Sequence, residues 1–418
     1  MTRRLWAQAV GALLLVACAG DEQGDVDTTV ASITTAPGAP TSARPVTTAA
    51  RSTEPSPTTA ATTPVTSTPP TTAGSTVDDA TAYAMAGPSP VGVTTLRLRD
   101  GPAVEVWYPA VDGTTGTVTY DVRDFVPQAI RDLLTAYVPA TYSFEGRRDA
   151  DVADGSFPVV LFSHGFTGIR LQSSFLTAHL ASWRMIVVAP DHPSRDLANV
   201  LSGTASGDVG ASVEDLLASL ELVTAASARR ASPFSGRVDA ERVAIVGHSA
   251  GGGTALLAAT DDRVDGYVSM ASGSRNEQAA LPDRPSFFLA GTVDRVVPPT
   301  RTRAAYERAP APSRYWELTD VGHNGFDDFC TFGGGTGIIG IAEASGLGPL
   351  LDERPELRRL GEDGCVPPAA PVRRAQPIIR HGVTAWLRSL FGIDEQPIGL
   401  GPEVDGAYDL AVTVESRP

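Results

Sequence analysis

One serine of this chain lies in a pattern that favours nucleophilic chemistry. The stretch Gly247-His248-Ser249-Ala250-Gly251 separates a β-branched apolar run at 242–246 from an alanine- and leucine-rich segment. This pattern predicts a strand, a tight turn and a helix, with Ser249 at the tip of the turn. The flanking glycines are needed because a strained serine turn leaves no room for a Cβ two residues to either side. A glycine-rich turn with an incidental serine is the alternative.

A serine nucleophile needs a base, and the base needs a group that orients it. His323 lies on a glycine-flanked loop after a strand-like segment, and Asp294 stands just beyond the strand-like segment 286–290. Serine, acid and histidine in this chain order match one known arrangement of a catalytic triad. A histidine in a solvent-exposed turn is the alternative for His323. Weaker candidates for the acid are Asp320, Asp327 and Asp328.

Two backbone amides are expected to stabilise an oxyanion. The helix predicted after Ser249 directs the Ala250 N–H toward the place where negative charge develops. The second N–H should come from a loop after an early strand. Phe166 fits this role, because Gly165 before it permits a close approach of the backbone.

Several residues are expected to border the substrate. Phe166, His192 and His248 are assigned to the pocket, and His248 is expected to be a buried neighbour of the nucleophile rather than a catalyst. The glycine-rich stretch 331–351 could cap the pocket or be a stabilising excursion. The loop-like stretch 196–210 is a second candidate for the rim.

The elements that must position these residues alternate between strand and helix. Apolar runs at 158–163, 185–190, 242–246, 264–270, 286–290 and 314–318 predict strands, and 171–183, 213–226, 254–259, 300–307 and 377–391 predict helices. Residues 93–99 and 103–108 predict a hairpin, and 125–137 predicts an amphipathic helix. The alternation indicates an α/β fold with a doubly wound, mostly parallel sheet and helices on both faces.

The N-terminal region predicts export. Residues 1–18 combine two arginines, a short apolar stretch and Leu15-Val16-Ala17-Cys18, which resembles a bacterial lipobox with Cys18 as the lipidated residue. Ordinary cleavage near Cys18 with release of the protein is the alternative. Residues 19–78 are rich in threonine, serine and proline, which favours a disordered tether. The folded domain is expected over 79–395, with a tail at 396–418 that adds a strand near 408–415.

The two other cysteines are expected to form a disulfide. In an exported protein, two cysteines that remain after Cys18 is assigned are expected to pair, so we predict a bond between Cys330 and Cys365. The bond would close a loop just after His323 and brace an insertion at about 327–372.

The amino-acid composition limits the kinds of partner that we expect the protein to bind. The net charge is −15, which argues against nucleic-acid binding through a basic face. All 33 lysine-or-arginine positions are arginine, which we attribute to a genome-wide bias. The sequence contains no zinc-spaced histidines or cysteines and no phosphate loop. We therefore expect no cofactor and no metal, a monomer, and membrane contact through the lipid anchor alone.

These motifs together resemble the α/β-hydrolase superfamily, within the group of platelet-activating-factor acetylhydrolases and polyester hydrolases. The resemblance covers about 158–391 and rests on Ser163-His164-Gly165-Phe166, Gly247-His248-Ser249-Ala250-Gly251-Gly252 and the segment that begins at His323. The chain departs from the polyester hydrolases in its long insertion and in lacking a tryptophan at 268–274.

The resemblance implies a hydrolase that cleaves carboxylic esters, of a small molecule, a lipid or a polymer, through an acyl-enzyme. A peptidase or acyltransferase of the same fold is one alternative. A non-catalytic surface binding protein on a hydrolase scaffold is the other.

Overall fold

The computed structural model describes residues 79–274 and 278–418. The predictions of a signal peptide, of lipidation at Cys18 and of a disordered tether fall on residues 1–78, outside the described residues. The first described element is a 3₁₀ turn, η1 Asp79–Thr81.

A ten-stranded sheet organises the fold, in the order β12-β11-β10-β9-β8-β6-β7-β2-β1-β5. Its six central strands are parallel, and antiparallel strands join them at both sides. The central strands are β6 Phe157–Ser163, β7 Ile186–Pro190, β8 Val238–His248, β9 Gly266–Met270, β10 Ser286–Gly291 and β11 Ser313–Leu318. The outer strands are β1 Val91–Arg97, β2 Ala103–Pro109, β5 Arg147–Arg148 and β12 Val412–Arg417. A separate two-stranded sheet pairs β3 Thr117–Asp121 with β4 Thr141–Glu145.

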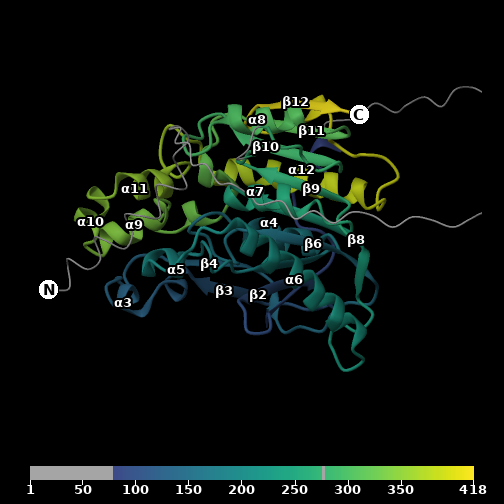
Figure 1. Ribbon diagram of the computed structural model, residues 1–418, viewed down its shortest axis with the longest axis horizontal. Coiled ribbons are helices and arrows are strands. Elements are labelled where there is room, and N and C mark those ends of the chain that lie inside the picture. Colours follow the sequence, from purple (N-terminus) through teal and green to yellow (C-terminus); the bar gives the residue numbers. More distant parts are fainter. Residues whose placement is uncertain (1–78, 275–277) are drawn as a thin grey trace, which may run out of the picture. The chain divides into compact units, whose positions relative to one another are not determined.

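Helices pack on both faces of this sheet (Figure 1). α4 Ser174–Ser182 and α12 Val372–Leu390 share one core with the sheet, and α6 Val209–Ala228, α7 Ala250–Ala258 and α8 Pro299–Arg308 share the other. Successive residues of β6 alternate between the two cores, because side chains of a strand point to opposite faces. The doubly wound arrangement predicted from the sequence is therefore confirmed, and it is the α/β-hydrolase fold.

The predicted helix at 125–137 is wrong. The structure has a 3₁₀ turn at Val122–Phe125 and a single helical turn, α3 Gln128–Arg131, with no buried residue. A short helix needs tertiary packing of its apolar face to remain stable. Pro127 lies at the start of α3. Several of the apolar side chains that suggested a longer helix line the cavity beside Ser249.

Three further boundaries differ from the predictions. The stretch 196–210 contains a helix, α5 Leu197–Ser202, whose first turn is capped by the Asp196 carboxylate. α12 begins at Val372 and continues through Pro377, because its buried face packs along the whole length of the helix. The C-terminal tail belongs to the domain, since β12 pairs with β11 and extends the main sheet beyond residue 395.

The insertion after His323 is helical. It contains α9 Gly337–Ala344, α10 Gly348–Asp352 and α11 Pro355–Glu362, which contact one another and lie together in Figure 1. A disulfide joins Cys330, before these helices, to Cys365, after them. Within residues 79–274 and 278–418, we find no helix that combines the length and the apolar character needed to cross a membrane.

Removal of the disulfide is expected to lower the free energy of unfolding by about 4 kcal/mol, because 35 residues separate its cysteines and the open loop gains entropy in the unfolded chain. Urea unfolding of the Cys330→Ala/Cys365→Ala protein measures the effect. A reductant should destabilise the parent and leave this variant unchanged. Equal stability of parent and variant would contradict the prediction.

Candidate active site

Ser249 lies in a strained turn between β8 and α7. Its φ and ψ are 57° and −123°, a conformation that non-glycine residues rarely adopt. A Cβ at Gly247 would come within 2.1 Å of the Gly251 carbonyl oxygen, and one at Gly251 within 1.9 Å of the Ser163 carbonyl oxygen. The two glycines are therefore required sterically, as the motif predicts, and the strain directs the serine side chain away from the sheet.

The structure brings Ser249, His323 and Asp294 into one chain of hydrogen bonds. His323 Nε2 lies 2.9 Å from Ser249 Oγ, and His323 Nδ1 lies 2.8 Å from Asp294 Oδ2. The other carboxylate oxygen, Asp294 Oδ1, accepts from the backbone N–H groups of Val296 and Val297 at 2.9 and 2.7 Å. Asp294 therefore accepts the Nδ1 proton of His323, which leaves Nε2 free to accept the proton of the serine hydroxyl.

The other acidic candidates lie elsewhere. Asp320 is exposed. Asp327 Oδ2 lies 3.7 Å from His248 Nδ1, and Asp328 accepts from the Phe175 backbone N–H. The structure shows no hydrogen bond from either of them to the His323 ring within the described residues.

The two predicted oxyanion donors flank Ser249. A Cβ at Gly165 would lie 3.2 Å from Ser249 Cβ, so the loop that carries Phe166 passes directly beside the serine. In the described part of the chain, neither the Phe166 N–H nor the Ala250 N–H donates to a protein acceptor. Both amides are thus available to an anionic oxygen that forms beside Ser249.

Gln172, which the sequence analysis missed, links the loops around Ser249. Its Oε1 accepts from the Gly165 N–H at 3.1 Å, and its Nε2 donates to His248 Nδ1 at 2.8 Å. His248 Nε2 donates in turn to the His323 carbonyl oxygen at 3.1 Å. Both ring nitrogens of His248 are therefore occupied, and burial keeps its pKa well below 6.5. His248 borders the cavity as predicted, but it connects the loops instead of offering a free polar atom.

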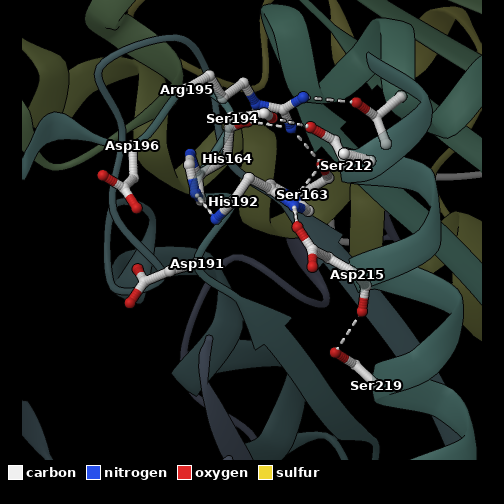
Figure 2. A network of polar contacts seen from close by, with 12 residues as sticks. Ser163, His164, Asp191, His192, Ser194, Arg195, Asp196, Ser212, Asp215 and Ser219 are labelled. Atoms are coloured by element: carbon white, nitrogen blue, oxygen red, sulfur yellow. Dashed lines mark hydrogen bonds and ion pairs between the residues drawn. The ribbon is translucent and has the colours of Figure 1, made fainter. Parts of the chain in front are cut away.

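Behind the Phe166 loop lies a buried polar network, shown in Figure 2. Arg195 donates to the His164 carbonyl oxygen, to Ser163 Oγ at 2.7 Å and to Thr254 Oγ1 at 2.8 Å. Its own carbonyl oxygen accepts from the backbone N–H of Thr167 at 2.9 Å. Arg195 therefore holds the Phe166 loop through His164 before it and Thr167 after it. Nothing in the local sequence indicated this role.

The predicted place of His192 in the substrate pocket is wrong. His192 is fully buried in the Figure 2 network, with Nε2 3.0 Å from Ser163 Oγ and Nδ1 3.3 Å from Asp215 Oδ2. The three residues resemble a second triad, but Ser163 is fully buried and already bound by Arg195. Burial lowers the pKa of His192 far below 6.5 and raises that of Asp215 to about 6. This cluster therefore supports the loop structurally.

Asp363, also missed from the sequence, joins the two loops that carry the acid and the histidine. Its Oδ1 accepts from the His323 N–H at 2.8 Å, and its Oδ2 accepts from the Arg295 N–H at 3.0 Å. It is 1% exposed and lies two residues before the disulfide cysteine Cys365. The insertion and its disulfide therefore hold the carboxylate that fixes the spacing of Asp294 and His323.

Asp363→Asn is expected to lower kcat on the order of 10-fold, with a smaller change in KM. An amide can accept only one of the two backbone hydrogen bonds, so one loop shifts, and sub-ångström misplacement of catalytic groups slows reaction more than it weakens binding. Steady-state kinetics on a soluble ester measures the effect. Asp352→Asn, at an exposed aspartate of the same insertion, is the control. Loss of substrate affinity alone would contradict the positioning role.

Two adjacent carboxyl groups, Asp327 and Asp328, are buried under the site. Burial raises the pKa of both well above the ordinary value near 4. The folded protein therefore binds more protons here than the unfolded chain does. As the pH rises from about 4 toward the raised values, these groups must ionise in place, and stability is lost.

Asp328→Asn is expected to reduce this pH dependence. The amide resembles the neutral carboxyl group, so the free energy of unfolding should rise at pH 8 and should change little at pH 4. Urea unfolding at pH 4 and 8 measures it, with Asp409→Asn as the exposed control. A variant as pH-dependent as the parent would contradict the prediction.

A cavity of about 880 Å³ opens from Ser249 and His323. It is bordered by Phe166 and Gln172 at the serine end, by α5, and by the insertion helices α9 to α11. The insertion was expected either to cap the pocket or to be a stabilising excursion. In the structure its helices form a wall of the cavity, which is closer to the first of these roles. Among residues 79–274 and 278–418, no cluster of three or more histidine, cysteine or acidic residues could hold a metal ion.

Comparisons with known proteins agree with this geometry. Residues 150–340 match the PETase family, described as PET hydrolase-like, and the matched range contains Ser249, Asp294 and His323. A ferulic acid esterase from Streptomyces cinnamoneus has a similar structure, with a TM-score of 0.52, 20% identity, and coverage of 80% of this chain and 99% of the esterase. At that identity the likeness shows the shared fold. No protein of curated function has a sequence significantly similar to this chain.

Proposed function

Because this chain has the α/β-hydrolase fold, we propose that it is a serine esterase that cleaves carboxylic esters through an acyl-enzyme. One observation carries the proposal: Ser249, His323 and Asp294 form a continuous chain of hydrogen bonds at the end of a substrate-sized cavity. The match of the same segment to the PET hydrolase-like family supports ester hydrolysis.

In the acylation step, Ser249 Oγ attacks the ester carbonyl carbon while His323 Nε2 accepts the hydroxyl proton. Asp294 stabilises the imidazolium cation that forms, because it accepts the Nδ1 hydrogen bond. The carbonyl oxygen becomes an oxyanion between the Phe166 and Ala250 N–H groups. Each such donor typically lowers the barrier by about 3 kcal/mol.

Collapse of this intermediate breaks the bond between the carbonyl carbon and the alcohol oxygen. His323 then donates its proton to the departing alkoxide, and the acyl group remains on Ser249. A water molecule enters, gives its proton to His323 and attacks the acyl carbon. The second intermediate releases the carboxylic acid, and the proton returns to Ser249 Oγ.

The fold alone does not distinguish an esterase from a peptidase, an acyltransferase or a binding protein. A binding protein has no need of a complete triad, and the three residues are correctly oriented here. We therefore place the esterase first.

We also propose that the protein is exported and anchored through Cys18. The Cys330–Cys365 disulfide supports this location, because disulfides persist in oxidising compartments. Loss of membrane association in a Cys18→Ala protein would support the anchor, and unchanged association would contradict it.

The experiment that tests the esterase is a rapid-mixing assay with p-nitrophenyl acetate. We expect a burst of one p-nitrophenol per protein molecule, and a mass increase of one acetyl group on the peptide that contains Ser249. Ser249→Ala should show neither. Turnover that persists in this variant, or an acyl group on another residue, would contradict the mechanism.

A further inference from the structure

The cavity beside Ser249 is far larger than a short acyl group needs. Its volume of about 880 Å³ lies near the upper end of the range of pockets that bind small molecules. An acetyl group would leave most of this space without contacts. A substrate that fits the cavity must therefore carry a large group attached to the ester.

The first wall comes from the segment 122–134, which overlaps the helix predicted at 125–137. Val126, Ile130 and Leu134 line the cavity from this segment, although the helical turn α3 buries none of its residues in the core. Leu133, beside them, lines the cavity too and is 58% exposed. These apolar side chains thus line the cavity, and Val126 and Leu134 also pack against the main core.

The second and third walls are also aliphatic. α5 contributes Leu197, Val200 and Leu201. The insertion contributes Ile338 and Ile341 from α9 and Leu357 from α11, among others. Three capping segments, separate in the sequence, therefore direct apolar side chains into one space that ends at the nucleophile. We call this space the acyl chamber.

The chamber lacks the features that would select an aromatic group. Of its described lining residues, only Phe166 and Phe329 have aromatic rings apart from the two histidines at the catalytic end. Its charged lining residues are Arg123, Asp327, Glu353 and Arg354, and the side chain of Arg123 is bound to Asp121 and to the Thr135 carbonyl oxygen. Ring stacking requires aromatic faces, whereas a flexible alkyl chain is best accommodated by branched aliphatic side chains.

We propose that the acyl chamber binds the alkyl chain of a fatty acyl ester of eight or more carbons, so that acyl lipids are the substrate class. This inference rests on the proposed function, since it places the acyl carbonyl at Ser249. The chain lies between the three aliphatic walls, and its carbonyl oxygen lies at the Phe166 and Ala250 N–H groups. Burial of the chain holds the ester and excludes water from the reacting atoms.

The proposal makes a quantitative statement about chain length. Each additional methylene that enters an apolar site strengthens binding in the transition state by about fourfold. The value of kcat/KM should therefore rise with acyl length until the chamber is filled. Octanoate has six more methylenes than acetate, so we expect a rise on the order of 10³-fold between the two esters.

The test uses the full chain and p-nitrophenyl esters from acetate to dodecanoate, together with p-nitrophenyl benzoate, each below its aggregation limit. A rise of kcat/KM through octanoate, with benzoate below octanoate, supports the proposal. A preference for acetate or benzoate that depends on Ser249 would overturn the acyl chamber and leave the esterase in place. If no ester is hydrolysed in a Ser249-dependent manner, both fail.

Two variants on opposite walls test the chamber itself. Ala342→Trp on α9 and Ile130→Trp on α3 each place a bulky ring in the space assigned to the chain. We expect the dodecanoate-to-acetate ratio of kcat/KM to fall at least 10-fold in each. Ala225→Trp, at an exposed position of α6 outside the cavity, is the matched control and should keep the parental ratio. If both wall variants also keep that ratio, the chain does not lie in the chamber.

Discussion

Ser249→Ala is expected to lower kcat for ester hydrolysis by about 10⁶-fold, and His323→Ala should lower it by a similar factor. The two residues act as one unit, because the histidine activates the serine across a 2.9 Å hydrogen bond. When either residue is absent, the other no longer contributes to acylation. The double variant should therefore be no slower than either single variant.

Steady-state kinetics of the two single variants and the double variant on one p-nitrophenyl ester measures this. Ser202→Ala, at an exposed serine at the end of α5, is the matched control and should retain parental activity. Circular dichroism and urea unfolding establish that each variant is folded. If the losses of the two single variants multiply in the double variant, the residues act independently and the proposed mechanism is wrong.

Asp294→Asn is expected to lower kcat by about 10⁴-fold with little change in fold. The amide oxygen should take the place of Oδ1, which accepts from two backbone N–H groups, so the NH₂ group would face His323. Nδ1 must then accept a hydrogen bond, and the ring proton moves to Nε2. A protonated Nε2 cannot accept the proton of Ser249, so acylation stops.

Measurement of kcat for Asp294→Asn beside Asp320→Asn tests the choice of acid. Asp320 is exposed and has a positive φ of 60°, a conformation that asparagine also tolerates, so this control should fold and retain activity. A large loss of activity in Asp320→Asn, with full activity in Asp294→Asn, would show that Asp294 is not the acid that orients His323.

The sequence by itself determined the features that depend on local sterics and periodicity. The nucleophile turn could be predicted because Gly247 and Gly251 have one steric explanation, and the structure shows the close contacts that require them. The central strands were clear from short apolar runs, since both faces of a parallel sheet are buried. Asp294 and His323 could be placed because each directly follows such a strand.

Long-range contacts decided the rest. The apolar residues at 125–137 indicated a helix, but they line the cavity or pack against the core from a largely irregular segment, so no continuous helical face formed there. His192 follows a strand as a pocket residue would, yet Arg195 and Asp215 enclose it in a buried network. The bonds of Asp363 to the two catalytic loops also cross sequence separations of 40 and 68 residues.

The physical reason is the same in each case. A turn, a strand or a cap is specified by neighbours in the chain, whose steric and hydrogen-bonding preferences act at once. A cavity wall or a buried carboxylate is specified by residues that meet only after the sheet has assembled. The reactive groups of this protein were therefore evident from the sequence, whereas the space that selects a substrate was determined by tertiary structure.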